Sequence, residues 1–143
     1  MKKIICLVVV VLMIASVAYA QKKMKITAKD LPALKGTWTG ILSFGVMETG
    51  GTSPVTLEIL NDSVPVKGRI TVTNVPDFVA SQYGLQTGKN VAESDEGLIT
   101  SQGTIMWTGP QKNFFEATHT GEKKLSVWYF FKGMKGEASL KKK

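Results

Sequence analysis

"LKGTWTGILSF", residues Leu34 to Phe44, is the stretch of sequence that decides the fold. Trp38, Leu42 and Phe44 fall on one face of an extended chain, and threonine and serine residues fall largely on the other. An alternation with a period of two is typical of a strand that buries one face. The sequence therefore predicts a strand whose tryptophan points into a core.

The same alternation recurs along most of the chain, between turns rich in glycine, asparagine and aspartate. It predicts seven strands, and an eighth if the polar stretch 85–97, which otherwise reads as a loop, contains a short strand near 90–93. We therefore expect an all-β fold, an antiparallel up-and-down meander barrel of 7–8 strands, because closure removes exposed strand edges. A sandwich, with residues 74–97 as its crossing connection, is the alternative.

Two segments break the alternation and predict short helices. Residues 28–36, AKDLPALKG, read as one helical turn that Asp30 can cap and in which Pro32 can take an early position. Residues 76–83 begin with Pro-Asp and suit a second short helix or a flap. Both are expected as additions to the barrel.

Residues 1–20 have the features of a cleaved signal peptide. The start MKK is basic, the run Ile4–Ile14 is apolar, and the sequence AYA that ends at Ala20 matches the small-x-small cleavage rule. A transmembrane anchor is the alternative, but the run is shorter than the about 20 residues that cross a bilayer. We expect cleavage after Ala20 and a bacterial protein, periplasmic or secreted, with no membrane span in its mature chain. That chain then has a flexible start, 21–27, and one domain, 28–143.

Few residues of the mature chain suit catalysis or metal binding. Cys6 is the only cysteine and lies in the leader, which excludes a disulfide, a thiol nucleophile and a cysteine-based metal site. His119 is the only histidine. The acidic stretch ESDEG, residues 93–97, lacks the spaced ligands of a calcium loop. We therefore expect no enzyme activity, no metal and no cofactor.

The formal charge of +7 arises from lysines that concentrate near the two ends of the chain. Arg69 is the only arginine, whereas nucleic-acid recognition prefers arginine forks with aromatic residues on one surface. No nucleic-acid partner is therefore expected. Lysine-rich termini are typically solvated tails. A weak attraction to anionic lipid or polysaccharide is the alternative, and it rests on charge alone.

The opening of the first strand resembles that of the lipocalin and calycin group. The matching residues are Leu34, Gly36, Trp38 and Gly40, preceded by the short helical turn. The resemblance implies a small barrel in which the tryptophan closes one end and the interior takes a small apolar ligand. Lipocalins usually set an arginine from near the end of the chain against this tryptophan, whereas this chain has only lysines there.

Two other groups of barrels have a similar opening. The avidin group opens with Gly-Thr-Trp and lines its pocket with tryptophans, but its polar pattern is not found around Thr39, so biotin is not predicted. Nitrobindin-type haem barrels share the Gly-x-Trp-x-Gly of residues 36–40. Their haem histidine lies near the C-terminus, whereas a lone histidine such as His119 is usually structural. Haem is therefore not expected.

The inward face of the predicted barrel supplies the leading functional hypothesis, a small apolar molecule bound in the interior. Eight-stranded barrels have a size at which side chains either fill the interior or leave room for one small ligand. The expected lining residues are Trp38, Leu42, Phe44, Leu57, Ile70, Ile105, Trp107, Phe115 and Tyr129.

The run LSVWYFF, residues 125–131, is apolar on both faces and supplies the alternative hypothesis. Trp128 and Phe130 share the face that points away from the interior. Cover by the flap or the N-terminal helix would bury them. Without cover they form an exposed aromatic patch that binds a second copy or another protein, as in an inhibitor or an envelope-assembly module.

Overall fold

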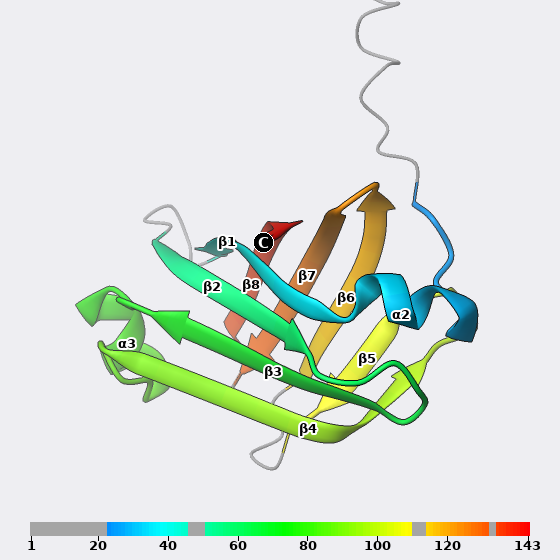
Figure 1. The fold of residues 1–143 in the computed structure, drawn as a ribbon. Coiled ribbons are helices and arrows are strands. Elements are labelled where there is room, and N and C mark those ends of the chain that lie inside the picture. The colour runs from blue at the N-terminus through cyan, green and yellow to red at the C-terminus, as the bar shows by residue number, and fades with distance from the viewer. Residues whose placement is uncertain (1–22, 46–50, 110–113, 132–133) are drawn as a thin grey trace, which may run out of the picture.

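The computed structural model describes residues 23–45, 51–109, 114–131 and 134–143, and their arrangement is shown in Figure 1. Eight antiparallel strands pair in chain order, and the first pairs with the last. The predicted up-and-down barrel is confirmed and the sandwich is excluded. The elements are η1 (Ala28–Asp30), α2 (Leu31–Leu34), β1 (Gly36–Phe44), β2 (Thr52–Ile59), β3 (Val66–Thr73), α3 (Asp77–Tyr83), β4 (Lys89–Ile99), β5 (Ile105–Thr108), β6 (Phe114–Gly121), β7 (Lys124–Phe131) and β8 (Met134–Lys142).

The barrel has two different ends. Because β1 directly follows α2 and neighbouring strands are antiparallel, odd-numbered strands begin, and even-numbered strands finish, at the end next to α2. We call this the α2 end. The helix α3 joins β3 to β4 at the opposite end, which we call the α3 end (Figure 1).

The prediction of a loop over 85–97 is wrong for most of its length. Residues Lys89–Ile99 form β4, an eleven-residue strand that pairs with β3 and has a register shift near Gly68. Its inward residues include Ala92, Ser94 and Gly97, which are small. Small inward residues give no hydrophobic alternation, so the usual signal of a strand is missing from this sequence.

Both predicted helices are present, although the first is capped differently from the prediction. The carboxylate of Asp30 accepts hydrogen bonds from Thr27 N at 2.8 Å and Thr27 Oγ1 at 2.7 Å, and it makes no capping bond to α2. The residues Leu31 and Leu34 of α2 are buried against the barrel. Gly84 ends α3 in the left-handed conformation that glycine favours.

Two backbone hydrogen bonds attach the segment before η1 to the barrel. Met24 N donates to His119 O at 2.9 Å, and Ile26 N donates to Gly103 O at 2.9 Å. Ile26 is buried. The predicted signal peptide and its cleavage site lie outside the described residues. No helix in the described part of the chain is long and apolar enough to cross a membrane.

Candidate functional site

Every residue expected to line the interior lies on the inward face of the barrel. At most 4% of the surface of any of them is exposed. The orientation predicted from the alternation is thus confirmed, and their role in binding stays a prediction. The strand β1 contributes Trp38, Leu42 and Phe44, β2 contributes Leu57, β3 Ile70, β5 Ile105 and Trp107, β6 Phe115, and β7 Tyr129.

Trp107 fills the part of the interior towards the α2 end. Its indole Nε1 donates to Val66 O at 2.9 Å, and its ring stacks on Phe115 with 4.9 Å between centroids. A Cβ atom at Gly68 would lie 2.6 Å from the ring, and one at Gly97 would lie 2.3 Å from Nε1. Atoms do not approach so closely without moving, so the indole occupies the space that side chains at these two positions would take.

Trp38 closes the α2 end of the interior. Its Nε1 donates to Leu34 O at 2.8 Å, which ties β1 to α2. Lys142 Nζ lies 5.6 Å from the centroid of the Trp38 ring, within reach of a cation–π interaction, and donates to Ala33 O. A lysine of the last strand therefore stands against the tryptophan, where the lipocalin resemblance implies an arginine.

The interior at the α3 end contains a polar group of a different kind, the hydroxyl of Tyr129. Tyr129 lies beside Phe115 of β6 and Gly136 of β8 in the strand register and is 4% exposed. Among the described residues, no group hydrogen-bonds to this hydroxyl. Burial raises the pKa of Tyr129 to about 12, because an apolar surrounding disfavours the phenolate. A neutral hydroxyl is therefore available in this part of the interior.

The other buried hydroxyls in the described residues do have partners. Ser53 Oγ donates to Asn74 O at 3.3 Å, Ser94 Oγ accepts from Glu96 N at 3.3 Å, and Thr104 Oγ1 donates to Glu116 Oε1 at 2.6 Å. Buried polar groups in folded proteins are nearly always paired. Tyr129 is the exception among the described residues.

The segment of residues 74–90, which contains α3, covers this end. Val79 and Ala80 point into the core, whereas Phe78 is 44% exposed. Within the segment, Asn74 N donates to Gly88 O, Leu85 N to Ala80 O, and the Asn90 side chain pairs with the backbone of Gln86, while Asn74 O accepts from Ser53 Oγ of β2. A short connecting segment opens locally at lower cost than a strand of the barrel.

Trp128 and Phe130 lie half-buried on the outer wall of the barrel, the orientation predicted for them. Phe130 contacts Phe114 with 5.2 Å between ring centroids and Trp128 with 6.2 Å. Lys135 Nζ lies 3.4 Å from the centroid of the Trp128 ring, a cation–π contact. We call Phe114, Trp128, Phe130 and the adjoining Lys135 the outer aromatic cluster. Each of these side chains covers part of the next.

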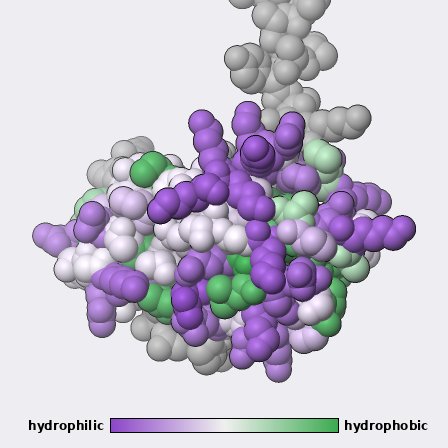
Figure 2. Space-filling model, viewed as in Figure 1, coloured by the Kyte–Doolittle hydropathy of each residue, from purple (hydrophilic) through white to green (hydrophobic). Residues whose placement is uncertain are grey.

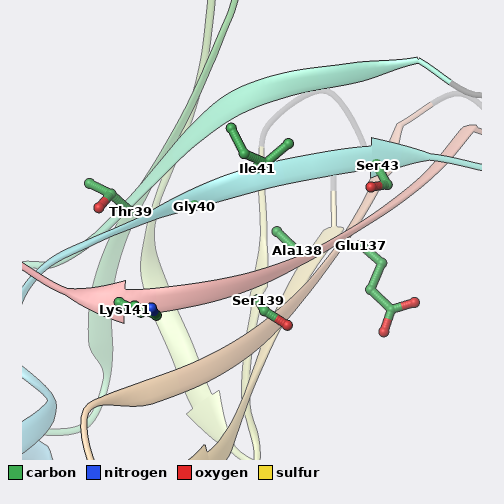
Figure 3. Close-up of a pocket in the computed structure, with 8 residues that line it drawn as sticks. All are labelled: Thr39, Gly40, Ile41, Ser43, Glu137, Ala138, Ser139 and Lys141. Carbon is green, nitrogen blue, oxygen red and sulfur yellow. The ribbon is translucent and has the colours of Figure 1, made fainter.

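A hollow of about 540 Å³ lies on the outer wall where β1 and β8 pair (Figure 3). Its walls include Thr39, Ile41, Glu137 and Lys141, and Figure 3 shows these side chains spread along the two strands without meeting at a common point. Ile41 is 54% exposed. Without convergent polar groups, the hollow has no arrangement that could orient a small molecule or perform chemistry.

Sequence reasoning missed two parts of the interior. The sequence predicts a loop at Gly97, whereas the structure places this glycine on the inward face of β4 against Trp107, and a glycine inside a strand is a signal for close packing. Val79 and Ala80 were placed in a helix or flap without an inward role. Their burial depends on how α3 folds back over the barrel, which no local pattern indicates.

The geometry of the described residues includes no metal site of the usual kind. No three or more histidine, cysteine, aspartate and glutamate side chains gather in the described part of the chain. His119 is half-buried, and its backbone carbonyl holds Met24. No known protein family, curated protein or solved structure matches this chain, so its function has to be argued from its own residues.

Proposed function

We propose that the protein is an exported, non-enzymatic barrel that binds a small apolar molecule in the α3 half of its interior, with the Tyr129 hydroxyl as the polar contact. The observation that carries the proposal is this hydroxyl, buried among apolar side chains with no partner among the described residues. A buried polar group without a partner costs on the order of 1–3 kcal/mol. A ligand with one hydrogen-bonding group would recover that cost.

The position within the barrel follows from the packing. Trp107 and its two glycines occupy the interior towards the α2 end, and Trp38 and α2 close that end. A ligand that entered there would have to displace fully buried tryptophans. At the α3 end it would have to displace side chains of a short connecting segment, in which Val75, Val79 and Ala80 are buried and Tyr83 and Leu85 pack against the core. Entry at the α3 end is therefore favoured.

Export and the absence of catalysis are supported by the sequence. Residues 1–20 have the basic start, apolar run and cleavage motif of a signal peptide, which supports a periplasmic or secreted protein. The chain after Ala20 has no cysteine and one histidine. A carrier needs neither, because its interior provides shape and a single hydrogen bond instead of a reacting group.

The first test is binding of a neutral fluorescent probe, N-phenyl-1-naphthylamine, to the mature chain from Gln21. The probe is apolar, has one N–H group and has no charge that the lysines could attract. We expect saturable binding of one probe per chain and, by native mass spectrometry of protein from its host, a monomer with a discrete small mass.

The matched variants are Tyr129→Phe and Trp128→Phe, neighbours on opposite faces of β7. Tyr129→Phe should weaken probe binding about fivefold, the value of one hydrogen bond worth about 1 kcal/mol. Trp128→Phe should leave the affinity unchanged. Equal affinities for both variants, or a bare monomer that does not take up the probe, would contradict an interior site at Tyr129.

The outer aromatic cluster supports a second candidate function, association with another copy or another protein. Trp128, Phe130 and Phe114 place adjoining aromatic rings on the outer wall, and interfaces are enriched in such residues. Trp128→Ser should then change the mass of the assembly measured by light scattering, with the fold intact by circular dichroism. A mass unchanged from a monomeric wild type would contradict self-association.

A further inference from the structure

The fold gathers lysines from three separate parts of the chain. Backbone contacts join them: Met24 N to His119 O places Lys23 beside β6, Lys142 N donates to Lys123 O at 3.2 Å, and Lys143 N donates to Thr37 O at 2.9 Å. We call the group the lysine cluster. Its members are Lys23, Lys123, Lys124, Lys141, Lys142 and Lys143, all exposed except the half-buried Lys142.

One pair of lysines in this cluster opposes folding. Lys124 and Lys141 stand directly opposite each other on neighbouring strands, and like charges in that position are destabilising. Glu122 is the acidic residue next to the cluster along the chain, and Asp30, which shares a hollow with Lys123 and Lys142, has its carboxylate bonded to Thr27. Lys142 donates to Ala33 O and lies against Trp38, but the other lysines of the cluster have no ion pair among the described residues, so their charge is suited to a partner of opposite sign.

The lysine cluster lies at the surface. Figure 2 shows hydrophilic side chains projecting at the top of the view, where the turn between β6 and β7 and the end of β8 lie, as well as along the other edges. Glu58 lies nearby, opposite Thr37 of β1, but it pairs with Arg69, as Glu93 also does. Asp62 pairs with Lys35. The positive charge of the cluster is therefore suited to attract an anionic surface.

Two features favour a lipid bilayer over an anionic polymer. Met24, which is apolar and 46% exposed, lies among the lysines and can contact acyl chains. The cluster contains only lysines, which act as point charges towards a layer of phosphates, without the forks of arginine that read a polymer backbone.

We propose that the lysine cluster docks the barrel on a bilayer of anionic lipid, through the phosphates of its headgroups. The proposal is independent of the ligand site, which lies at the opposite end of the barrel. Docking in this orientation leaves α3 facing away from the membrane.

The test is flotation of the mature chain from Gln21 with phosphatidylcholine vesicles that contain or lack phosphatidylglycerol. This part of the chain includes every strand and the whole described core, so it is the folding unit. We expect flotation only with phosphatidylglycerol and release by high salt, because salt screens exposed charges.

The variants are a triple charge reversal in the cluster, Lys123→Glu, Lys124→Glu and Lys141→Glu, and a control reversal elsewhere, Lys67→Glu, Lys89→Glu and Lys135→Glu. Both change the net charge equally. The cluster variant should lose binding on the order of a hundredfold, since each lysine near an anionic surface contributes roughly fivefold. The control should stay within a few-fold of the wild type by the same reasoning.

Three results would overturn the proposal. Equal binding to vesicles without phosphatidylglycerol would show that the contact with the bilayer is apolar and does not depend on anionic headgroups. An equal loss in the control variant would assign the effect to net charge alone. Failure to float, with retention on heparin, would identify an anionic polymer as the partner. Unfolding midpoints measured on all three proteins show that any loss is not a loss of the fold.

Discussion

The two ends of this barrel use the same alternating strands in opposite ways. Towards the α2 end, Trp107 packs on two glycines and Trp38 hydrogen-bonds to α2, so the interior is filled by interlocking side chains. At the α3 end, the segment around a short helix adds Val75, Val79 and Ala80 to the core, and the hydroxyl of Tyr129 lacks a partner among the described residues. The α2 end of the interior is therefore closely packed, and the α3 end is where we propose that a ligand binds.

The largest expected effect comes from removing the side chain that fills the α2 half. Trp107→Ala should lower the free energy of unfolding by about 4 kcal/mol, because it leaves a large cavity and removes the bond to Val66. Urea unfolding measures the loss. Trp128→Ala, on the outer wall, should cost about 1 kcal/mol, the scale of an aromatic or cation–π contact. Equal losses of unfolding free energy in the two variants would show that the filled interior contributes no more to stability than the outer wall.

A smaller change tests the same packing from the opposite side. Gly97→Ala should cost about 2 kcal/mol, since its Cβ would lie 2.3 Å from Trp107 Nε1 and 2.4 Å from Val66 O. Gly88→Ala, in the segment that covers the α3 end, is the control because nothing lies within 4 Å of its added carbon. If both variants unfold at the same urea concentration, the tight fit around Trp107 is not a source of stability.

At the α3 end, alkaline pH probes the buried phenol. The folded pKa of Tyr129 is about 12, above the ordinary value of 10, because burial disfavours the charged form. Its contribution is therefore complete below pH 10 and is lost as the pH rises towards 12, on the order of 2 kcal/mol. Tyr129→Phe lacks this component, so its stability should fall less than that of the wild type over this range. Parallel curves for the two proteins would show that Tyr129 is not buried in solution.

The smallest effect is expected at Asp30, in the turn that leads into α2. Thr27 holds the pKa of the Asp30 carboxyl below its ordinary value by donating two hydrogen bonds to it. The resulting stability is present above the ordinary pKa of 3.8 and is lost as the pH falls through the lowered value. Asp30→Asn should cost about 0.5 kcal/mol at neutral pH. Thermal melts at neutral and acid pH should show the cost shrinking on acidification.

Most of the barrel could be predicted from the sequence because most strands bury large side chains on one face. The inward positions of Trp38, Leu57 and Phe115 all follow from a period of two. The strand β4 could not be predicted in this way, since its inward residues are small and one of them, Gly97, lies against Trp107. The side chain that requires a small residue there belongs to another strand, so the requirement is visible only in the three-dimensional structure.

The candidate sites were predictable to a different degree. That Tyr129 points inward follows from alternation, but its lack of a hydrogen-bond partner among the described residues depends on every neighbouring strand. The lysines at the two ends of the chain were visible as tails in the sequence. Their meeting with Lys123 and Lys124 depends on barrel closure, which brings β8 beside both β1 and β7.

Closure by the first and last strands has a consequence for the order of folding. The pairing of β1 with β8 joins residues at opposite ends of the sequence, so its loop-closure entropy is the largest of any strand pair. During synthesis the sheet stays open until the nine residues of β8 have emerged, and both edge strands remain unpaired until then. Any truncation that removes β8 exposes the edges of β1 and β7 together and makes the remaining sheet a template for aggregation.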